Sequence, residues 1–139
     1  MPIPKLGESG ELPAGIHRAS LKEVEKMFGS TTDRRKVLMR GLRQAAKNFK
    51  DGGVTDIYID GSFTTEKLFP NDIDGCWDPQ GADPAIVDPV FWDCHDEADF
   101  HNRLRPAMKQ RYGLDFLCLT KYSQPFFKKI VKAAQKESF

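Results

Sequence analysis

The stretch IDGSFTTEKLFPNDIDGCW, residues 59–77, contains two short apolar patterns separated by a turn. Alternation of apolar and polar residues predicts a strand over residues 54–60, which Gly61 and Ser62 end. After nine intervening residues, the acidic triplet DID opens a second predicted strand over residues 73–77. The Gly-Ser turn should therefore lie at the end of one strand and face the acidic triplet on the neighbouring strand.

This spacing places residues that suit phosphate beside residues that suit a metal ion. Gly61 allows a sharp turn and a close approach of phosphate, and the following amides and the Ser62 hydroxyl can donate hydrogen bonds to it. Asp72 and Asp74 are two residues apart on a strand, so both carboxylates leave the same face. Two convergent carboxylates suit Mg²⁺, which prefers oxygen ligands. The alternative is a surface Gly-Ser turn followed by an Asx turn at Asn71-Asp72.

Helical patterns precede this stretch. Ser20, three residues before Glu23, predicts a capping box that opens a short amphipathic helix ending at Gly29. A second helix is expected from residue 32 or 33 to residue 49. Its other face, interpreted as solvated, is basic: Arg34, Arg35, Lys36, Arg40, Arg43 and Lys47. The alternative for this basic face is a surface that contacts phosphate or a partner.

The remaining patterns complete a small mixed fold. We expect a helix over residues 95–111 that Pro106 bends or divides, a strand over 114–119 and a last helix over 122–136. Residues 1–15, rich in proline and glycine, are expected to form an extended arm. The chain is therefore predicted to be one domain, residues 1–139, of the α/β or α+β class, with helices packed on a small mixed sheet.

Composition limits the possible partners and the compartment. Lys and Arg total 21 and Asp and Glu total 20, and this balance argues against generalised DNA binding or attachment to an anionic membrane. No apolar run approaches the roughly 20 residues that a membrane span needs. The cysteine spacing predicts reduced thiols and a cytoplasmic protein, with Cys76 and Cys118 buried as small hydrophobes. Cys94, His95 and His101 do not fit the ligand spacing of a closed zinc site.

The pattern from the turn to the acidic triplet resembles the nucleotidyltransferase signature of the DNA polymerase beta superfamily. Residues 12–93 also look like small prokaryotic nucleotidyltransferase-like proteins, on LPAGIH at 12–17, GSF at 61–63, NDID at 71–74 and CWD at 76–78. The resemblance implies a nucleotidyltransferase-like fold. It also implies transfer of a nucleoside monophosphate from a nucleoside triphosphate, such as ATP, to an acceptor hydroxyl.

The resemblance implies roles for individual residues. Asp72 and Asp74 would be catalytic and would bind Mg²⁺ or Mn²⁺, while Gly61 and Ser62 would bind the nucleotide phosphates. An enzyme of this superfamily needs a third carboxylate on a neighbouring strand. Asp115, a lone acid in an apolar strand, is the best candidate for this third catalytic residue and metal ligand.

Some other residues keep two interpretations. Asp60 is the second candidate for the third acid, and Asp115 could instead face water at a strand edge. Lys67 is a candidate nucleotide-binding residue, although a solvated loop lysine is the simpler interpretation. Phe63 and Trp77 could stack on a base or pack in the core.

Two functions remain open at this point. The first is a Mg²⁺-dependent nucleotidyltransferase whose acceptor is a protein side chain or an RNA end, similar to the stand-alone domains of toxin–antitoxin and phage-defence pairs. The second is a catalytically inactive nucleotidyltransferase fold that binds a partner as an antitoxin or regulatory subunit. Convergence of the three carboxylates would favour the enzyme.

Overall fold

The structure is a computed structural model that describes residues 3–92, 104–119 and 129–134. Its main elements are β1 (Gly15–Ala19), α1 (Leu21–Phe28), α2 (Asp33–Asp51), β2 (Asp56–Asp60), β3 (Ile73–Trp77), α4 (Arg105–Tyr112), β4 (Leu114–Cys118) and β5 (Lys129–Ala134). Two short 3-10 turns, η1 (Gly61–Thr64) and η2 (Pro89–Phe91), follow β2 and β3. The chain is a small α+β fold, as predicted.

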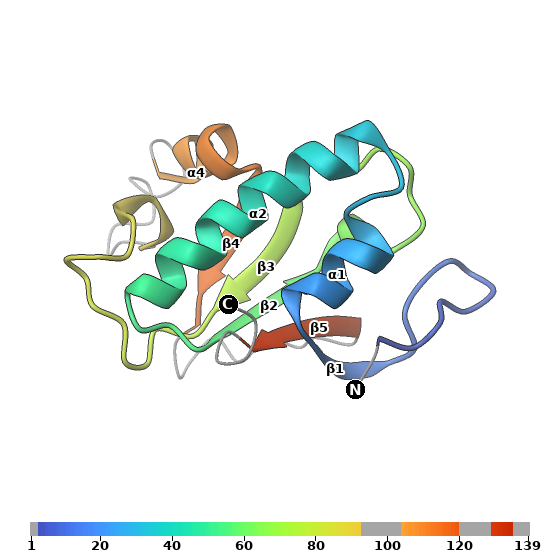
Figure 1. The fold of residues 1–139 in the computed structure, drawn as a ribbon, viewed down its shortest axis with the longest axis horizontal. Helices are drawn as coiled ribbons and strands as arrows, with labels where there is room; N and C mark the ends of the chain where they lie inside the picture. Colours follow the sequence, from blue (N-terminus) through green and yellow to red (C-terminus); the bar gives the residue numbers. More distant parts are fainter. Residues whose placement is uncertain (1–2, 93–103, 120–128, 135–139) are drawn as a thin grey trace.

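The strands form one mixed sheet in the order β1-β5-β2-β3-β4. Strand β2 runs antiparallel to β3 and β5, whereas β3 and β4 are parallel, as are β1 and β5. Helices α1 and α2 lie over one face of this sheet, and α4 lies beside α2 near β4 (Figure 1). The turn after β2, the start of β3 and the start of β4 therefore lie near one another.

The two helices predicted before the Gly-Ser turn are confirmed, and their first residues follow from side-chain caps. The Ser20 hydroxyl accepts from the Glu23 amide at 3.2 Å, and the Glu23 carboxylate accepts from the Ser20 amide at 3.3 Å, so the capping box is complete. Thr32 caps α2 by accepting from the Arg35 amide at 3.1 Å. Gly29 ends α1 as predicted.

Aromatic side chains hold α2 against the sheet. The Phe49 ring lies 5.2 Å from Trp77 and 6.3 Å from Phe116, measured between centroids. Trp77 donates its indole N–H to the carbonyl of Phe91 at 3.0 Å. Phe63 and Trp77 are fully buried, so both pack in the core and neither is available to stack on a base. Burying each such ring stabilises the fold by about 1.5–3 kcal/mol.

The predicted last helix is wrong over the part that the structure describes. Residues 129–134 form β5, which pairs with β1 on one side and β2 on the other. Two β-branched residues, Ile130 and Val131, favour a strand, and main-chain pairing on both edges outweighs a helical spacing of apolar residues. The rest of the predicted 122–136 helix lies outside the described residues.

The structure also bears on two smaller predictions. Gly15, the last residue of the predicted arm, begins strand β1, which pairs with β5. Pro106 lies in the first turn of α4, where its missing N–H is not needed. Within the described residues, the predicted helix over 95–111 corresponds to α4, and residues 95–103, with Cys94 before them, lie outside the described part.

Candidate functional site

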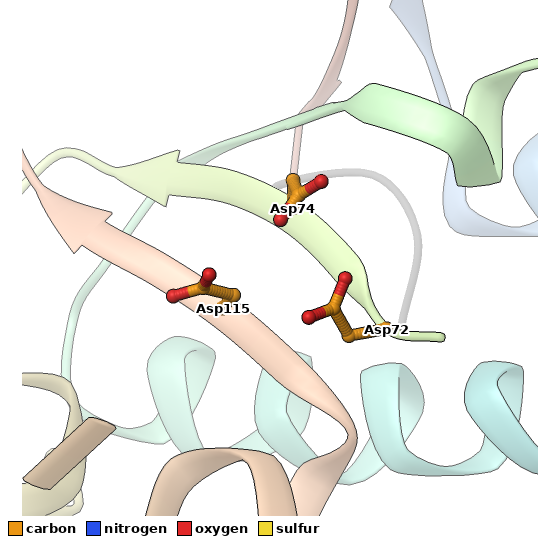
Figure 2. A group of neighbouring side chains, drawn as sticks. All are labelled: Asp72, Asp74 and Asp115. Atoms are coloured by element: carbon orange, nitrogen blue, oxygen red, sulfur yellow. The ribbon is translucent and has the colours of Figure 1, made fainter. Parts of the chain in front are cut away.

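Three carboxylates meet at the start of β3 and β4. Asp74 and Asp115 are direct partners in the parallel β3–β4 register, so both leave the same face of the sheet. Asp72 stands two residues before Asp74, just ahead of β3. One oxygen from each carboxylate lies within 4.8 Å of the other two, and all three groups point into a shared space (Figure 2). The structure thus brings together the three acids that the sequence analysis singled out.

Strand register explains why Asp115 reaches this place. Its neighbours Leu114 and Phe116 are buried in the core, so the side chain between them must leave the opposite face. Only 11% of the Asp115 side chain is exposed to solvent. The alternative interpretation, that Asp115 faces water at a strand edge, is therefore wrong.

Asp60, the second candidate, lies beside this group. It is the register partner of Asp74 in the antiparallel β2–β3 pair. Burial raises the pKa of its carboxyl. Among the described residues, the group of acids close enough to share a cation consists of Asp72, Asp74 and Asp115. Asp60 adds negative charge next to this group.

The crowded carboxylates favour a bound cation or proton. The pKa of Asp74 is raised to about 6, first by burial and then by repulsion from Asp72, Asp115 and Asp60. A divalent ion at this point would reverse that repulsion, because all three acids present oxygen ligands of the type Mg²⁺ and Mn²⁺ prefer. The donor set therefore fits a hard divalent cation.

Two cations of α4 already contact the acids. Arg105 donates to both oxygens of Asp115, from Nε at 2.9 Å and from Nη2 at 2.6 Å. The Nζ of Lys109 lies 3.4 Å from Asp72 Oδ2 and 4.0 Å from Asp115 Oδ2. The sequence analysis missed this pair. Its signal was a basic residue at i and i+4 of a helix, which places both on one helix face just before the strand of Asp115.

The Gly61 turn directly adjoins the acids. Gly61 has a φ of +73°, and a Cβ at this position would collide with Oδ2 of Asp74. Glycine alone satisfies both the left-handed conformation and the close approach. The predicted proximity of the Gly-Ser turn and the acidic triplet is confirmed.

A hollow of about 390 Å³ opens beside this turn. Its walls include Gly61, Ser62, Thr64, Thr65 and Glu11. The hydroxyls of Thr64 and Thr65 are committed, since they donate to the carbonyls of Gly61 and Ser62 at 3.1 and 2.7 Å. Within the described residues, the Ser62 hydroxyl has no such bond, so it remains able to donate to a ligand in the hollow.

A buried arginine holds the loop after the turn in place. Arg35 is only 2% exposed, which corrects its predicted place on the solvated face of the helix. Its guanidinium donates to the carbonyls of Phe63 and Thr65, each at 2.7 Å, and to those of Phe28 and Lys67 at 3.0 Å. The signal was its spacing, because Arg35 stands three and seven residues before buried Leu38 and Leu42 on the apolar face.

The remaining candidate residues from the sequence analysis lie outside the acidic group or outside the described residues. The Lys67 side chain is exposed and is not part of the wall of the hollow beside Gly61, while its carbonyl binds Arg35. Cys76 and Cys118 are buried and lie outside any disulfide among the described residues, as predicted. Cys94, His95 and His101 lie outside the described residues.

Comparison with known proteins gives a family but no relative of known activity. The chain belongs to the Family of unknown function (DUF6932), whose match covers residues 4–139. No curated protein and no solved structure matches the chain. Within the described parts of the chain, the structure contains no helix that is long and apolar enough to cross a membrane.

Proposed function

For this member of a family of unknown function, we propose the activity of a Mg²⁺- or Mn²⁺-dependent nucleotidyltransferase. It would move a nucleoside monophosphate from a nucleoside triphosphate to an acceptor hydroxyl. The observation that carries the proposal is the convergence of Asp72, Asp74 and Asp115 beside the Gly61-Ser62 turn. Since nucleoside triphosphates and reduced thiols are cytoplasmic, we place this activity in the cytoplasm.

In this proposal the three acids bind the metal ion and the Gly61-Ser62 turn binds the phosphates. Asp72, Asp74 and Asp115 would hold the divalent cation, which supplies Lewis-acid polarisation of the phosphoryl oxygens when bound. Ser62 and the amides at the start of η1 would donate hydrogen bonds to the β- and γ-phosphates, because the first amides of a helical turn lack acceptors within it. The negatively charged carboxylates would therefore bind the cation, and the hydrogen-bond donors of the turn would bind the anionic phosphates.

The reaction balances with the residues that are present. The acceptor oxygen forms a bond to the α-phosphorus, the bond from that phosphorus to the bridging oxygen breaks, and pyrophosphate leaves. The proton of the acceptor hydroxyl passes to a carboxylate of the site or to water. Ser62 stabilises the charge on the departing pyrophosphate, while Asp115 lies on the strand beside Asp74, where it can receive that proton or hold the ion that polarises the hydroxyl.

The α4 cations fit an anionic substrate. In the absence of a metal ion, Arg105 and Lys109 neutralise part of the acidic group. A divalent ion bound by the carboxylates would release these two side chains, and their charges would then face the phosphates of the nucleotide. The carboxylates would thus be compensated by Arg105 and Lys109 before the ion binds and by the ion afterwards, when the two side chains would compensate the phosphates.

One observation favours the second function, a nucleotidyltransferase fold that binds a partner without catalysis. Both Asp115 oxygens already accept hydrogen bonds from Arg105, so a side chain of the protein compensates the charge of this acid. In that case α4 would hold the fold together, and the protein would act as an antitoxin or regulatory subunit. The two functions differ in whether metal and nucleotide bind and whether label is transferred.

A transfer assay separates the two. The protein is incubated with each α-labelled nucleoside triphosphate and Mg²⁺, with candidate protein and RNA acceptors, and transfer of label and release of pyrophosphate are measured. We expect transfer by the wild type. Asp115→Asn should lower the rate about a hundredfold, near 2.7 kcal/mol of barrier, with a much smaller loss of nucleotide binding.

The control for this assay is Asp33→Asn, which removes a fully exposed acid at the start of α2. This variant should transfer at the wild-type rate. A wild type that transfers nothing, yet binds a protein partner tightly, would replace the enzyme with the binding module.

A further inference from the structure

A second hollow, of about 360 Å³, lies between α2 and α4 on the other side of the acidic group. Most of the polar side chains in its wall carry N–H groups that can donate hydrogen bonds to a ligand: Arg34, Arg40, Gln44, Lys109, Gln110 and Arg111. We propose that this hollow binds the acceptor, and that the acceptor is the 3′ end of a single-stranded nucleic acid. This inference rests on the proposed function, because it names the substrate that receives the nucleotide.

The hollow and the acids share residues. Asp72 forms part of its wall, and Lys109, also in the wall, lies 3.4 Å from Asp72. A ligand in this hollow therefore ends next to the acidic group. The hollow beside Gly61 adjoins the same group from the turn side, through Asp74. Two hollows around one set of carboxylates match a reaction with two substrates.

Packing of α2 against α4 builds this hollow. A Cβ at Gly41 would collide with the carbonyl of Tyr112, so only glycine lets the two helices approach this closely. The approach places basic residues of both helices around one space. The hollow is thus a fixed feature of the helix packing.

The cations of the hollow keep donors for a ligand. Arg34 gives only two of its five N–H groups to the carbonyls of Pro70 and Asn71. Arg111 binds Asp88 through Nη1, which leaves its other nitrogens. Arg40 is exposed and has no hydrogen-bond or ion-pair partner among the described residues. The positive charge of the hollow is therefore only partly compensated.

The chemistry of the wall favours a nucleic acid over a protein acceptor. Planar guanidinium groups match phosphate oxygens two at a time, and several lie around one small space. The amides of Gln44 and Gln110 can pair with base edges, which offer both donors and acceptors. The hollow's volume suits a ligand of about the size of one nucleotide, which fits the unpaired end of a single strand. Because the net charge of the chain is only +1, affinity for phosphate would have to come from a local site such as this one.

A binding experiment tests this assignment. Fluorescence anisotropy measures binding of labelled eight-nucleotide single strands of random sequence, as RNA and as DNA, and of an eight-residue acidic peptide, over a range of salt. For about three phosphate contacts, the logarithm of the association constant should fall against the logarithm of salt with a slope near −2. This slope with either RNA or DNA supports the assignment, and a difference in affinity between the two identifies the preferred sugar.

The key variant is Arg40→Gln, and Lys36→Gln is its matched control. Both remove one charge from an exposed position of α2, but Lys36 is not part of the wall of the hollow. Arg40→Gln should weaken binding roughly fivefold and make the salt slope shallower by about 0.7. Lys36→Gln should bind like the wild type. Equal binding by both variants would overturn the inference, as would tighter binding of the acidic peptide than of either strand.

Failure of the inference and failure of the proposed function can be told apart. Thermal stabilisation by Mg²⁺ with ATP is measured on the same protein without oligonucleotide. If Mg²⁺ and ATP stabilise but no strand binds, the acceptor assignment is wrong while the nucleotide site stands. If the strand binds through Arg40 but Mg²⁺ and ATP have no effect, the proposed transfer is wrong and this hollow remains a nucleic-acid site. In that second case its role as an acceptor site is overturned.

Discussion

Replacing Arg105 with glutamine should destabilise the protein and, at the same time, tighten its binding of Mg²⁺. Arg105 makes two short hydrogen bonds to Asp115, whose side chain is 11% exposed. Without them, Asp115 faces Asp72 and Asp74 with only Lys109 left at 4.0 Å. Repulsion among the three acids then increases, and a divalent cation no longer competes with the guanidinium.

The size of both effects follows from one ion pair. One hydrogen bond to a charged group contributes roughly 1.5–3 kcal/mol, and solvent screening brings the two bonds together down to the low end of this range, because 39% of the Arg105 side chain is exposed. We therefore expect a loss of about 1.5 kcal/mol, or about 5 °C in Tm for a chain of this length. The same free energy no longer opposes the cation, so the Kd for Mg²⁺ should fall about tenfold.

Thermal unfolding in EDTA and titration calorimetry with Mg²⁺ measure the two effects. The control is Arg111→Gln, which removes the same charge from the same helix and also breaks a double hydrogen bond, here to Asp88. It should lose stability without a change in Mg²⁺ affinity. An Arg105→Gln protein that binds Mg²⁺ no more tightly than the wild type would refute the competition between guanidinium and cation.

Two further predictions concern the acids and the buried arginine. Because the folded pKa of Asp74 is raised from 3.8 to about 6, its proton stabilises the native state fully below about pH 4, and this contribution is lost as the pH rises through 6. In EDTA, urea unfolding of Asp74→Asn should show less of this loss between pH 4 and 7, and an identical pH dependence for both proteins would contradict it. Arg35→Met should lower the free energy of unfolding by about 3 kcal/mol or more, because several loop carbonyls lose their donor, whereas exposed Arg40→Met should change it by less than about 0.5 kcal/mol. Urea midpoints measure this difference, and similar midpoints would show that Arg35 does not support the Gly-Ser loop.

Local signals predicted the central part of the fold. The capping box at Ser20, the apolar face of α2 and the strand alternation around the Gly-Ser turn are short-range patterns, and each corresponds to an observed element. The candidate third acid could also be found, because an acid flanked by buried apolar residues in a strand must leave the opposite face. These features depend on chain segments only a few residues long.

Features that depend on distant pairing could not be predicted in this way. Residues 129–134 have apolar residues at helical spacing, yet they form a strand because β1 and β2 offer unpaired edges on both sides. The spacing of Arg35 places it on the apolar face of its helix, but the loop carbonyls that accept hydrogen bonds from its guanidinium are brought there only by the fold. The spacing of Arg105 and Lys109 puts both on one helix face, but their ion-pair partners, Asp115 and Asp72, are identified only when α4 is placed beside β4.

Titration of the protein with Mn²⁺, followed by electron paramagnetic resonance of the free ion, tests the shared metal and nucleotide site most directly. We predict that Mn²⁺ binds to the wild type, that ATP tightens its binding, and that Asp72→Asn combined with Asp74→Asn abolishes both effects. Circular dichroism of the double variant confirms that it remains folded. Mn²⁺ binding that is absent from the wild type, or unchanged in a folded double variant, would contradict the assignment of these carboxylates to a metal-dependent nucleotide site.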